Sequence, residues 1–256
     1  MEKLTIIKVG GKIVEEKDSL KTFLHHFSSV KGHKLLVHGG GRSATALASK
    51  LGIESVMVNG RRITDSEMLN VVIMVYGGLV NKSIVAQLQA LGINALGLTG
   101  ADLNYMLSEK RPAEPVDYGF VGDVKAVDGS MLCELIAKDI VLVLAPLTHD
   151  KKGNLLNTNA DTIAAETAKA LAPFFDVSLI YCFEKNGVLL NEQDDQSVIP
   201  EINRTQFDRY VSQGIIRGGM IPKLENAFEA VASGVKEVII TKAEAINIQS
   251  GTRIYE

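Results

Sequence analysis

Two glycine-rich stretches in this chain have the composition of turns that hold an anion. Residues 6–11 read IIKVGG and residues 35–41 read LLVHGGG, so each stretch is a short apolar run followed by glycines. Three consecutive glycines cost too much backbone entropy to be the favoured choice for a turn that binds nothing. Successive backbone N–H groups in such turns form anion-holding concavities. The two stretches therefore predict a site for a negatively charged group.

Other known uses of a glycine turn fit the second stretch less well. Residues 39–44 satisfy the relaxed dinucleotide fingerprint, but the next strand-like run ends at Val58-Asn59 without the acidic residue that binds a ribose. The esterase loop HGGG requires a G-x-S-x-G nucleophile elbow, and the chain contains none. Gly11-Lys12 lacks the other residues of a Walker A loop. A tight strand-to-helix turn without a ligand stays as the alternative interpretation.

Charged and amide side chains occur at the ends of several other predicted elements. Lys8 lies inside the first apolar run, where a lysine is costly unless it is paired or serves a site. Asn159 and Asp161 begin a helical pattern and could instead be N-caps. Lys223 begins another helical pattern and by itself could be a solvated lysine. Because the carboxyl ends of parallel strands meet at one edge, the joint pattern predicts a single anion site there.

Apolar runs and helical patterns alternate along the chain. Six short runs rich in Ile, Val and Leu are typical of buried parallel strands, at residues 4–9, 34–38, 95–99, 139–145, 178–183 and 237–241. Helical patterns lie between them, at residues 16–30, 64–91, 161–171 and 223–232. The sequence therefore predicts an α/β fold, a three-layer αβα sandwich with an open, mainly parallel central sheet.

Short local signals refine this outline. Asn59-Gly60 between β-rich flanks predicts a hairpin, and residues 117–128 and 187–199 are typical of hairpins or loops. Thr64 and Glu67 have the spacing of a capping box, which predicts that Thr64 is the N-cap of the long helix that follows.

Composition narrows the functional classes. The 256 residues are 46% hydrophobic, and the net charge of −3 argues against a nucleic-acid-binding protein that uses a broad basic face. The apolar runs are too short to cross a bilayer and no signal peptide precedes them, so we expect no membrane partner. Cys133 and Cys182 lie in apolar surroundings and are expected to be reduced, as in a cytoplasmic protein. The histidines lack metal-ligand spacing, so no metal site is predicted.

Five motifs together resemble one family. IIKVGGK, VHGGG, NGRRIT, LLNTNAD and GGMIPK occur in this order, and from Lys8 to Lys223 they are similar to the motifs of the N-acetylglutamate kinases, a branch of the amino-acid kinase family. The resemblance implies ATP-dependent phosphorylation of the side-chain carboxylate of an N-acyl-L-glutamate. It also implies one amino-acid kinase domain over residues 1–256, present as a homodimer. An N-terminal lobe of about residues 1–175 would bind the acylglutamate and dimerise, and a C-terminal lobe of about residues 176–256 would bind ATP with Mg²⁺.

The resemblance also implies roles for individual residues. The catalytic residues would be Lys8 and Lys223, which stabilise the transferring phosphoryl group, and Asp161, which holds both lysines in place. The substrate-binding residues would be Gly40, Gly41, Arg62 and Asn159. The residues that bind ATP or its phosphates would be Gly10, Gly11, Glu184, Lys185, Asn186, Gly187, Val188, Leu189, Ile215, Ile216 and Arg217. No general base is required, because a substrate carboxylate with a pKa near 4.3 is already ionised at neutral pH.

Several features leave alternatives open. Glu184 stands where the family often has Asp, and Arg42 follows HGGG where the family often has Pro. Arg42, together with Arg61, could meet an additional carboxylate, so N-succinylglutamate is an alternative substrate. Another amino-acid kinase activity and a non-catalytic small-molecule sensor are further alternatives, although a sensor would not need two phosphoryl-facing lysines. The first strand starts by Leu4, without the extra N-terminal helix of arginine-inhibited members, so we expect no cooperative inhibition by arginine.

Overall fold

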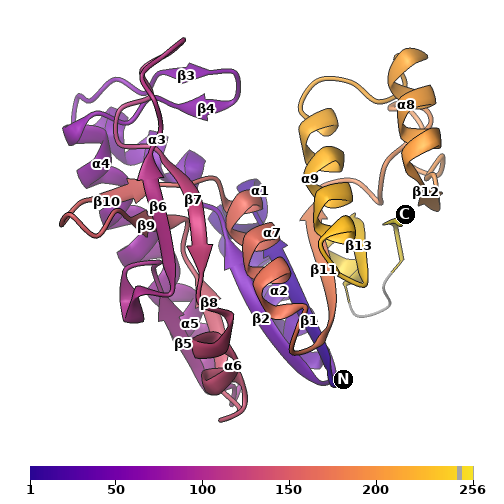
Figure 1. Ribbon diagram of the computed structural model, residues 1–256, viewed down its shortest axis with the longest axis horizontal. Helices are drawn as coiled ribbons and strands as arrows, with labels where there is room; N and C mark the ends of the chain where they lie inside the picture. The colour runs from indigo at the N-terminus through magenta and orange to yellow at the C-terminus, as the bar shows by residue number, and fades with distance from the viewer. Residues whose placement is uncertain (247–249, 256) are drawn as a thin grey trace.

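The computed structural model describes residues 1–246 and 250–255, and its largest element is one eight-stranded sheet (Figure 1). The strand order is β12-β14-β13-β11-β1-β2-β8-β5. The neighbouring pairs are parallel except for β13 and β14, which pair antiparallel. The strands are β1 Lys3–Val9, β2 His33–His38, β5 Ala95–Leu98, β8 Val141–Leu144, β11 Asp176–Phe183, β12 Glu201–Ile202, β13 Glu237–Lys242 and β14 Thr252–Ile254. All six predicted strands are therefore present in an open, mainly parallel sheet.

Helices cover both faces of this sheet. One face carries α1 Gly11–Glu15, α2 Lys17–Ser29, α3 Gly41–Lys50, α4 Ser66–Val72, η1 Ile73–Val80 and α5 Asn81–Ala90. The other face carries α6 Gly129–Ile136, α7 Ala160–Leu171, α8 Arg204–Ser212 and α9 Met220–Ala232. Short 3₁₀ turns occur at η2 Asp102–Asn104 and η3 Ala243–Ala245. This arrangement confirms the predicted three-layer αβα sandwich.

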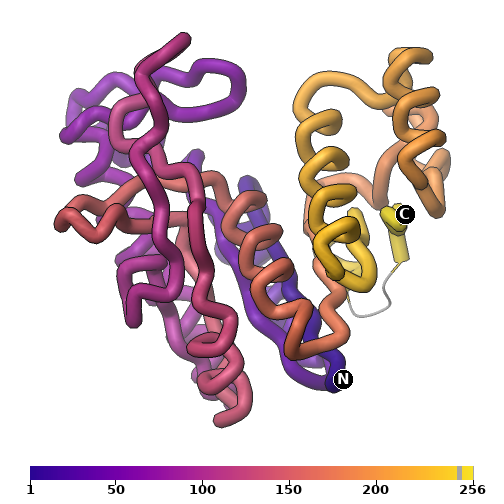
Figure 2. The backbone as a smooth tube through the Cα atoms, in the orientation of Figure 1, coloured from indigo at the N-terminus to yellow at the C-terminus, as the bar shows by residue number. Residues whose placement is uncertain are grey.

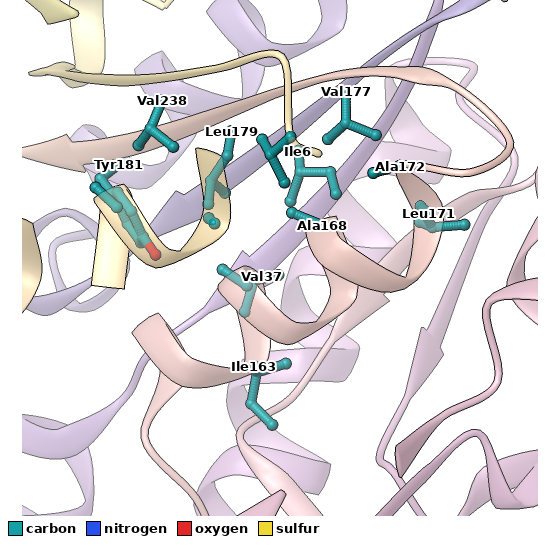
Figure 3. Close-up of a cluster of buried hydrophobic side chains, with 14 of the residues drawn as sticks. Ile6, Val37, Ile163, Ala168, Leu171, Ala172, Val177, Leu179, Tyr181 and Val238 are labelled. Atoms are coloured by element: carbon teal, nitrogen blue, oxygen red, sulfur yellow. The ribbon is translucent and has the colours of Figure 1, made fainter. Parts of the chain in front are cut away.

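Each central strand contributes apolar side chains to both layers, because successive side chains point to opposite faces. In β1, Ile6 packs into one core and Ile7 into the other. Figure 3 shows the first core, in which Leu179 of β11 and Ala168 of α7 lie near Ile6. The continuous apolar runs of the sequence are thus explained by burial on both faces.

A second, smaller sheet and a hairpin lie at the rim. The order of the second sheet is β10-β9-β6-β7, from strands β6 Met106–Lys110, β7 Gly122–Val127, β9 Leu147–His149 and β10 Leu155–Asn157. The hairpin joins β3 Met57–Val58 to β4 Arg61–Arg62. Asn59 and Gly60 have positive φ angles of 49° and 73°, as a hairpin of this type requires. The predicted Asn-Gly hairpin is therefore confirmed. Figure 2 shows that α8, α9 and β13 gather on the opposite side of the molecule from this hairpin.

The long helix runs from Ser66 to Ala90, but the predicted capping box is wrong. Its N-cap is Asp65, whose carboxylate accepts a hydrogen bond from the Met68 N–H at 2.8 Å. The Thr64 hydroxyl instead donates to the Arg62 carbonyl and accepts from Asn157, which lies far along the chain. The contact between Thr64 and Asn157 cannot be read from the local sequence. The N-cap is therefore Asp65, one residue later than predicted.

The middle of this helix, Ile73–Val80, is π-helical. By length and composition alone the helix Ser66–Ala90 could cross a membrane, although core helices of soluble proteins meet the same criterion. This 25-residue helix is longer than the short apolar runs on which the sequence-based prediction about membranes rested. Its buried side chains, among them Val71, Val75 and Ile84, pack in the second core against the sheet.

Candidate functional site

A cavity of about 430 Å³ opens at the carboxyl ends of β1 and β2. Both glycine turns line it, together with the starts of α3 and α7 and the hairpin β3–β4. Its lining includes four cationic side chains and, among the described residues, no carboxylate; the cations are Lys8, Arg42, Arg61 and Arg62. A cavity with this charge is suited to a ligand that carries more than one negative charge.

The two glycine turns touch each other beside this cavity. The Gly39 N–H donates to the Val9 carbonyl at 2.9 Å, and a Cβ at Gly39 would lie 3.4 Å from the Gly10 Cα. A Cβ at Gly10 would lie 2.8 Å from the Lys8 Nζ, so a side chain there would displace the ammonium group. Gly11 has a φ of 54°, which favours glycine. The prediction that both turns meet at one sheet edge is confirmed.

Lys8, Asp161 and Lys223 form one ion cluster at the edge of the cavity. The Lys8 Nζ lies 2.7 Å from the Asp161 Oδ1, and the Lys223 Nζ lies 2.6 Å from the Oδ2. Both ammonium groups also lie over the Phe183 ring, at 5.8 and 4.5 Å from its centroid. Burial by itself would raise the pKa of Asp161, but the charges of Lys8 and Lys223 outweigh it and lower the pKa to about 2. The carboxylate is therefore ionised at any physiological pH.

Three elements bring these residues together. Lys8 is near the end of β1, Asp161 is in the first turn of α7, and Lys223 is in the first turn of α9. The N-cap of α7 is Asn159, whose Oδ1 accepts from the Asp161 N–H at 2.7 Å. The capping interpretation is therefore confirmed for Asn159, which also lines the cavity, and is wrong for Asp161.

Arg62 is held firmly within the lining. Its side chain is buried and donates to the Gly41 carbonyl at 2.8 Å, to the Thr45 hydroxyl at 2.9 Å and to the Ser55 hydroxyl. These contacts leave two of the five N–H groups of the guanidinium for other partners. Arg62 lies in strand β4 of the hairpin, whereas Gly41 and Thr45 lie in α3, directly after the second glycine turn. Its hydrogen bonds therefore fix this turn relative to the hairpin.

Glu15 is a site residue that the sequence analysis missed. Its Oε1 accepts from the Ser43 N–H at 3.0 Å, so the carboxylate caps the N-terminus of α3 directly after the second glycine turn. Burial raises the pKa of Glu15, whereas the Ser43 hydrogen bond and the charge of Arg42 lower it. The charge of Arg42 is thus partly balanced by Glu15. In the sequence Glu15 is followed by Glu16, and the pair is typical of an exposed helix face.

The predicted nucleotide-binding residues of the C-terminal part lie outside this cavity. Gly187, Val188, Leu189 and Ile216 are buried, and a Cβ at Gly187 would lie 2.7 Å from the Thr252 Oγ1. Two exposed members are already paired: Lys185 with Asp195 at 2.6 Å and Arg217 with Glu192 at 2.5 Å. The remaining members, Glu184, Asn186 and Ile215, are at least partly exposed.

Two further expectations concern metal and thiol groups. Across residues 1–246 and 250–255, no group of three or more His, Cys, Asp or Glu side chains is placed to hold a metal ion. Cys133 and Cys182 are free thiols, one partly and one fully buried.

His38, the residue before the three glycines, is fully buried and links their turn to the long helix. Its Nδ1 lies 2.7 Å from the Gly39 carbonyl oxygen, and its Nε2 lies 3.1 Å from the Asn81 Nδ2, which also donates to the Val143 carbonyl. Because a carbonyl only accepts, Nδ1 carries the proton and Nε2 accepts from Asn81. Burial lowers the pKa of His38 to about 4. The imidazole is therefore neutral in the folded protein at pH 7.

Comparisons with known proteins extend the similarity over the whole chain. A model of the amino acid kinase family matches residues 3–242. An acetylglutamate kinase of Bacteroides fragilis is 67% identical over 253 residues, which are 99% of this chain and 97% of that protein. An acetylglutamate kinase of Parabacteroides distasonis is 68% identical over 255 residues, with 100% of each chain covered. Among solved structures, smu.665 from Streptococcus mutans UA159 has a TM-score of 0.79 at 28% identity and 98% coverage of both chains.

The buried imidazole of His38 predicts a loss of stability in mild acid. In the unfolded chain His38 takes up a proton near pH 6.5, whereas in the native protein it does so only near pH 4. The free energy of unfolding should therefore fall by about 3 kcal/mol as the pH is lowered from 7 to 4. Urea unfolding at several pH values measures this change in the wild type, in His38→Asn and in the exposed control His25→Asn. The contribution of about 3 kcal/mol should be lost only in His38→Asn, and the same fall in stability in that variant as in the wild type would contradict the assignment.

Proposed function

The chain belongs to the amino acid kinase family, and from that premise we propose that it transfers the γ-phosphoryl group of ATP to the side-chain carboxylate of N-acetyl-L-glutamate. The product is an acyl phosphate, and the reaction belongs to arginine biosynthesis. The observation that carries the proposal is the Asp161 carboxylate with a lysine on each oxygen, beside a cationic cavity.

The chemistry follows from these charges. An oxygen of the ionised substrate carboxylate attacks the γ-phosphorus, an O–P bond forms, and the bond to the β-phosphate oxygen breaks with its electron pair leaving on ADP. Phosphoryl transfer depends mainly on alignment and charge neutralisation. We assign Lys8 and Lys223 to the oxygens of the transferring group, because Lys8 lines the cavity and Asp161 holds the Lys223 ammonium group beside that of Lys8. Fixed charges of this kind need no reorganisation during the reaction.

The glycine turns and Arg62 would position the two anions. The N–H groups of Gly10 and Gly11 would face the phosphates, and those of Gly40 and Gly41 would face the place where phosphate and carboxylate approach. Arg62 and Asn159 would hold the α-carboxylate end of the acylglutamate. The support for this assignment is that all of these residues line one cavity. A two-pronged contact from Arg62 would use its two remaining N–H groups or replace a present partner.

We further propose that the C-terminal lobe, about residues 176–256, binds ATP with Mg²⁺. Glu184, Lys185, Asn186 and Arg217 are the members of the predicted set whose side chains are best placed to reach a nucleotide. Asp161, the carboxylate beside the cavity, is already paired with two lysines. The protein therefore offers Mg²⁺ no free carboxylate in this lining, and the ion would arrive with the nucleotide, ligated by phosphate oxygens and water. The free thiols support a reducing, cytoplasmic environment.

A direct test of the proposed function is trapping of the acyl phosphate with hydroxylamine. The wild type should form the hydroxamate from ATP and N-acetyl-L-glutamate, and Asp161→Asn should lower kcat about 100-fold, because it no longer holds both lysines in place. Asp161→Asn should lower the free energy of unfolding, because Lys8 and Lys223 lose their counter-charge. Asn159 still caps α7, so circular dichroism should show a folded variant.

Asp128→Asn is the matched control, because Asp128 caps α6 far from the cavity and its substitution should leave kcat unchanged. A wild type that forms no hydroxamate would refute the proposed activity and favour a sensor. Native turnover by Asp161→Asn would refute the role of Asp161.

A second candidate substrate is N-succinyl-L-glutamate, favoured by the position of Arg42 and Arg61 in the same lining as Arg62. If Arg42 contacts the additional carboxylate, Arg42→Ala should lower the succinyl-to-acetyl ratio of kcat/KM about tenfold to a hundredfold, as for loss of a charged hydrogen bond. Because Glu15 partly neutralises the charge of Arg42, we expect the ratio to fall by about tenfold rather than a hundredfold. Steady-state kinetics with both substrates measures the ratio, and Arg209→Ala on α8 is an exposed control. An unchanged ratio in Arg42→Ala would exclude this role.

We propose a homodimer that forms through the N-terminal lobe. The outward face of the long helix carries Met74 and Leu79, which are 50% and 63% exposed, and Gly78, beside which a side chain would meet open space. Small residues at such a position let two helices approach closely. Leu79→Lys should therefore convert the dimer to a monomer in sedimentation velocity. Leu190→Lys replaces a comparably exposed leucine of the C-terminal part and should leave the dimer intact. A monomeric or hexameric wild type would contradict the proposal.

A further inference from the structure

Tyr76 lies in the wall of the cavity, although its sequence context is that of an apolar core helix. It belongs to the π-helical segment Ile73–Val80, it is only 5% exposed, and it is one of the lining residues. π-helical turns are rare and occur frequently at functional sites. Tyr76 is therefore a candidate for direct contact with the bound substrate.

The ring of Tyr76 is fitted to the second glycine turn. A Cβ at Gly40 would lie 3.0 Å from Cδ1 and 3.1 Å from Cε1 of the ring. Real Cβ atoms seldom approach so closely, so any residue larger than glycine at position 40 would push the ring. The ring and the turn thus form one continuous surface of the cavity.

The side chains of Tyr76 and Arg62 both line the cavity, and Arg62 lies close enough to Tyr76 for its charge to act on the pKa of the phenol. A phenolic oxygen can accept a hydrogen bond from a guanidinium and still keep its own proton for donation. Burial raises the pKa of Tyr76, which keeps the group protonated at neutral pH, although the nearby charge of Arg62 acts in the opposite direction. Among the described residues, no protein acceptor takes this proton in a hydrogen bond. The cavity therefore contains an O–H donor next to a guanidinium.

We propose that the Tyr76 hydroxyl donates a hydrogen bond to the α-carboxylate of the N-acylglutamate and so helps to determine which acyl amino acids bind. This inference rests on the proposed function, in which Arg62 holds the same carboxylate. The described lining provides no carboxylate of its own, so a charged acceptor for this donor would come with the ligand. Arg62 supplies the charge, and Tyr76 adds a directional donor on a rigid ring.

The inference is tested by Tyr76→Phe, which removes only the hydroxyl. With N-acetyl-L-glutamate, KM should rise about tenfold to a hundredfold, as for loss of a hydrogen bond to a charged group. The values of kcat and of KM for ATP should be nearly unchanged, because a contact remote from the reacting carboxylate contributes equally to ground and transition states. Tyr105→Phe is the matched control, since the Tyr105 hydroxyl is fully buried, has no hydrogen-bond partner among the residues that the structure describes and lies outside the cavity.

A second substrate identifies the group that Tyr76 contacts. N-acetyl-4-aminobutyrate retains the reacting carboxylate and the acyl group but lacks the α-carboxylate. For this compound kcat/KM should be the same in the wild type and in Tyr76→Phe. An equal loss with both substrates would show that the hydroxyl acts on the protein structure, and this result would overturn the proposal, as would a native KM in Tyr76→Phe.

A failure of the Tyr76 proposal can be distinguished from a failure of the proposed kinase activity. A wild type without turnover would refute the kinase activity. Calorimetric binding of N-acetyl-L-glutamate to the wild type and to Tyr76→Phe would then decide the role of Tyr76 independently. Equal affinities in that experiment would overturn it.

Discussion

The ion cluster of Asp161 with Lys8 and Lys223 is the interaction on which the site depends. A lone charge in Asp161's buried position would be strongly unfavourable, and so would Lys8 at the end of a buried strand. Each offsets the cost of the other, and Lys223 adds a second cation on the free oxygen. Removal of one member of a buried pair typically costs about 3–5 kcal/mol, because the other charge is left unpaired. The cluster therefore joins β1, α7 and α9 while leaving a net positive charge toward the cavity.

The rest of the lining intensifies this excess of positive charge. Three arginines face the same cavity, and Arg62 is satisfied by neutral acceptors rather than by a carboxylate. Glu15 supplies a counter-charge, but it does so behind the glycine turn, at the N-terminus of α3. Cations that are held together by neutral hydrogen bonds repel one another, and bound anions relieve that repulsion. The cavity is therefore suited to anions, because the Glu15 carboxylate that offsets part of its charge is placed outside it.

The sequence predicted the scaffold of this site better than its lining. The six predicted strands and the meeting of the two glycine turns follow from patterns within a few residues, which is why they could be read directly. The N-cap at Asp65 could not be predicted in this way, because the Thr64 hydroxyl accepts a hydrogen bond from Asn157, which is distant in the sequence. Tyr76 is surrounded by apolar residues that are typical of a core helix, and no sequence pattern indicates that the backbone there is π-helical. Glu15 is typical of a surface charge until the fold brings Ser43 to it.

The same distinction explains why the residues proposed to bind the nucleotide are the least defined part of the site. In the turn Glu184–Leu189 the first three positions are at least partly exposed and the last three are buried. Its glycine is required by packing against Thr252 rather than by a ligand. A glycine by itself therefore does not indicate a phosphate. At Gly10 and Gly40 the close neighbours are instead the Lys8 ammonium and the Tyr76 ring, two groups that face the cavity. What separates a binding glycine from a packing glycine is the group that its missing side chain makes room for, and only the folded chain supplies that group.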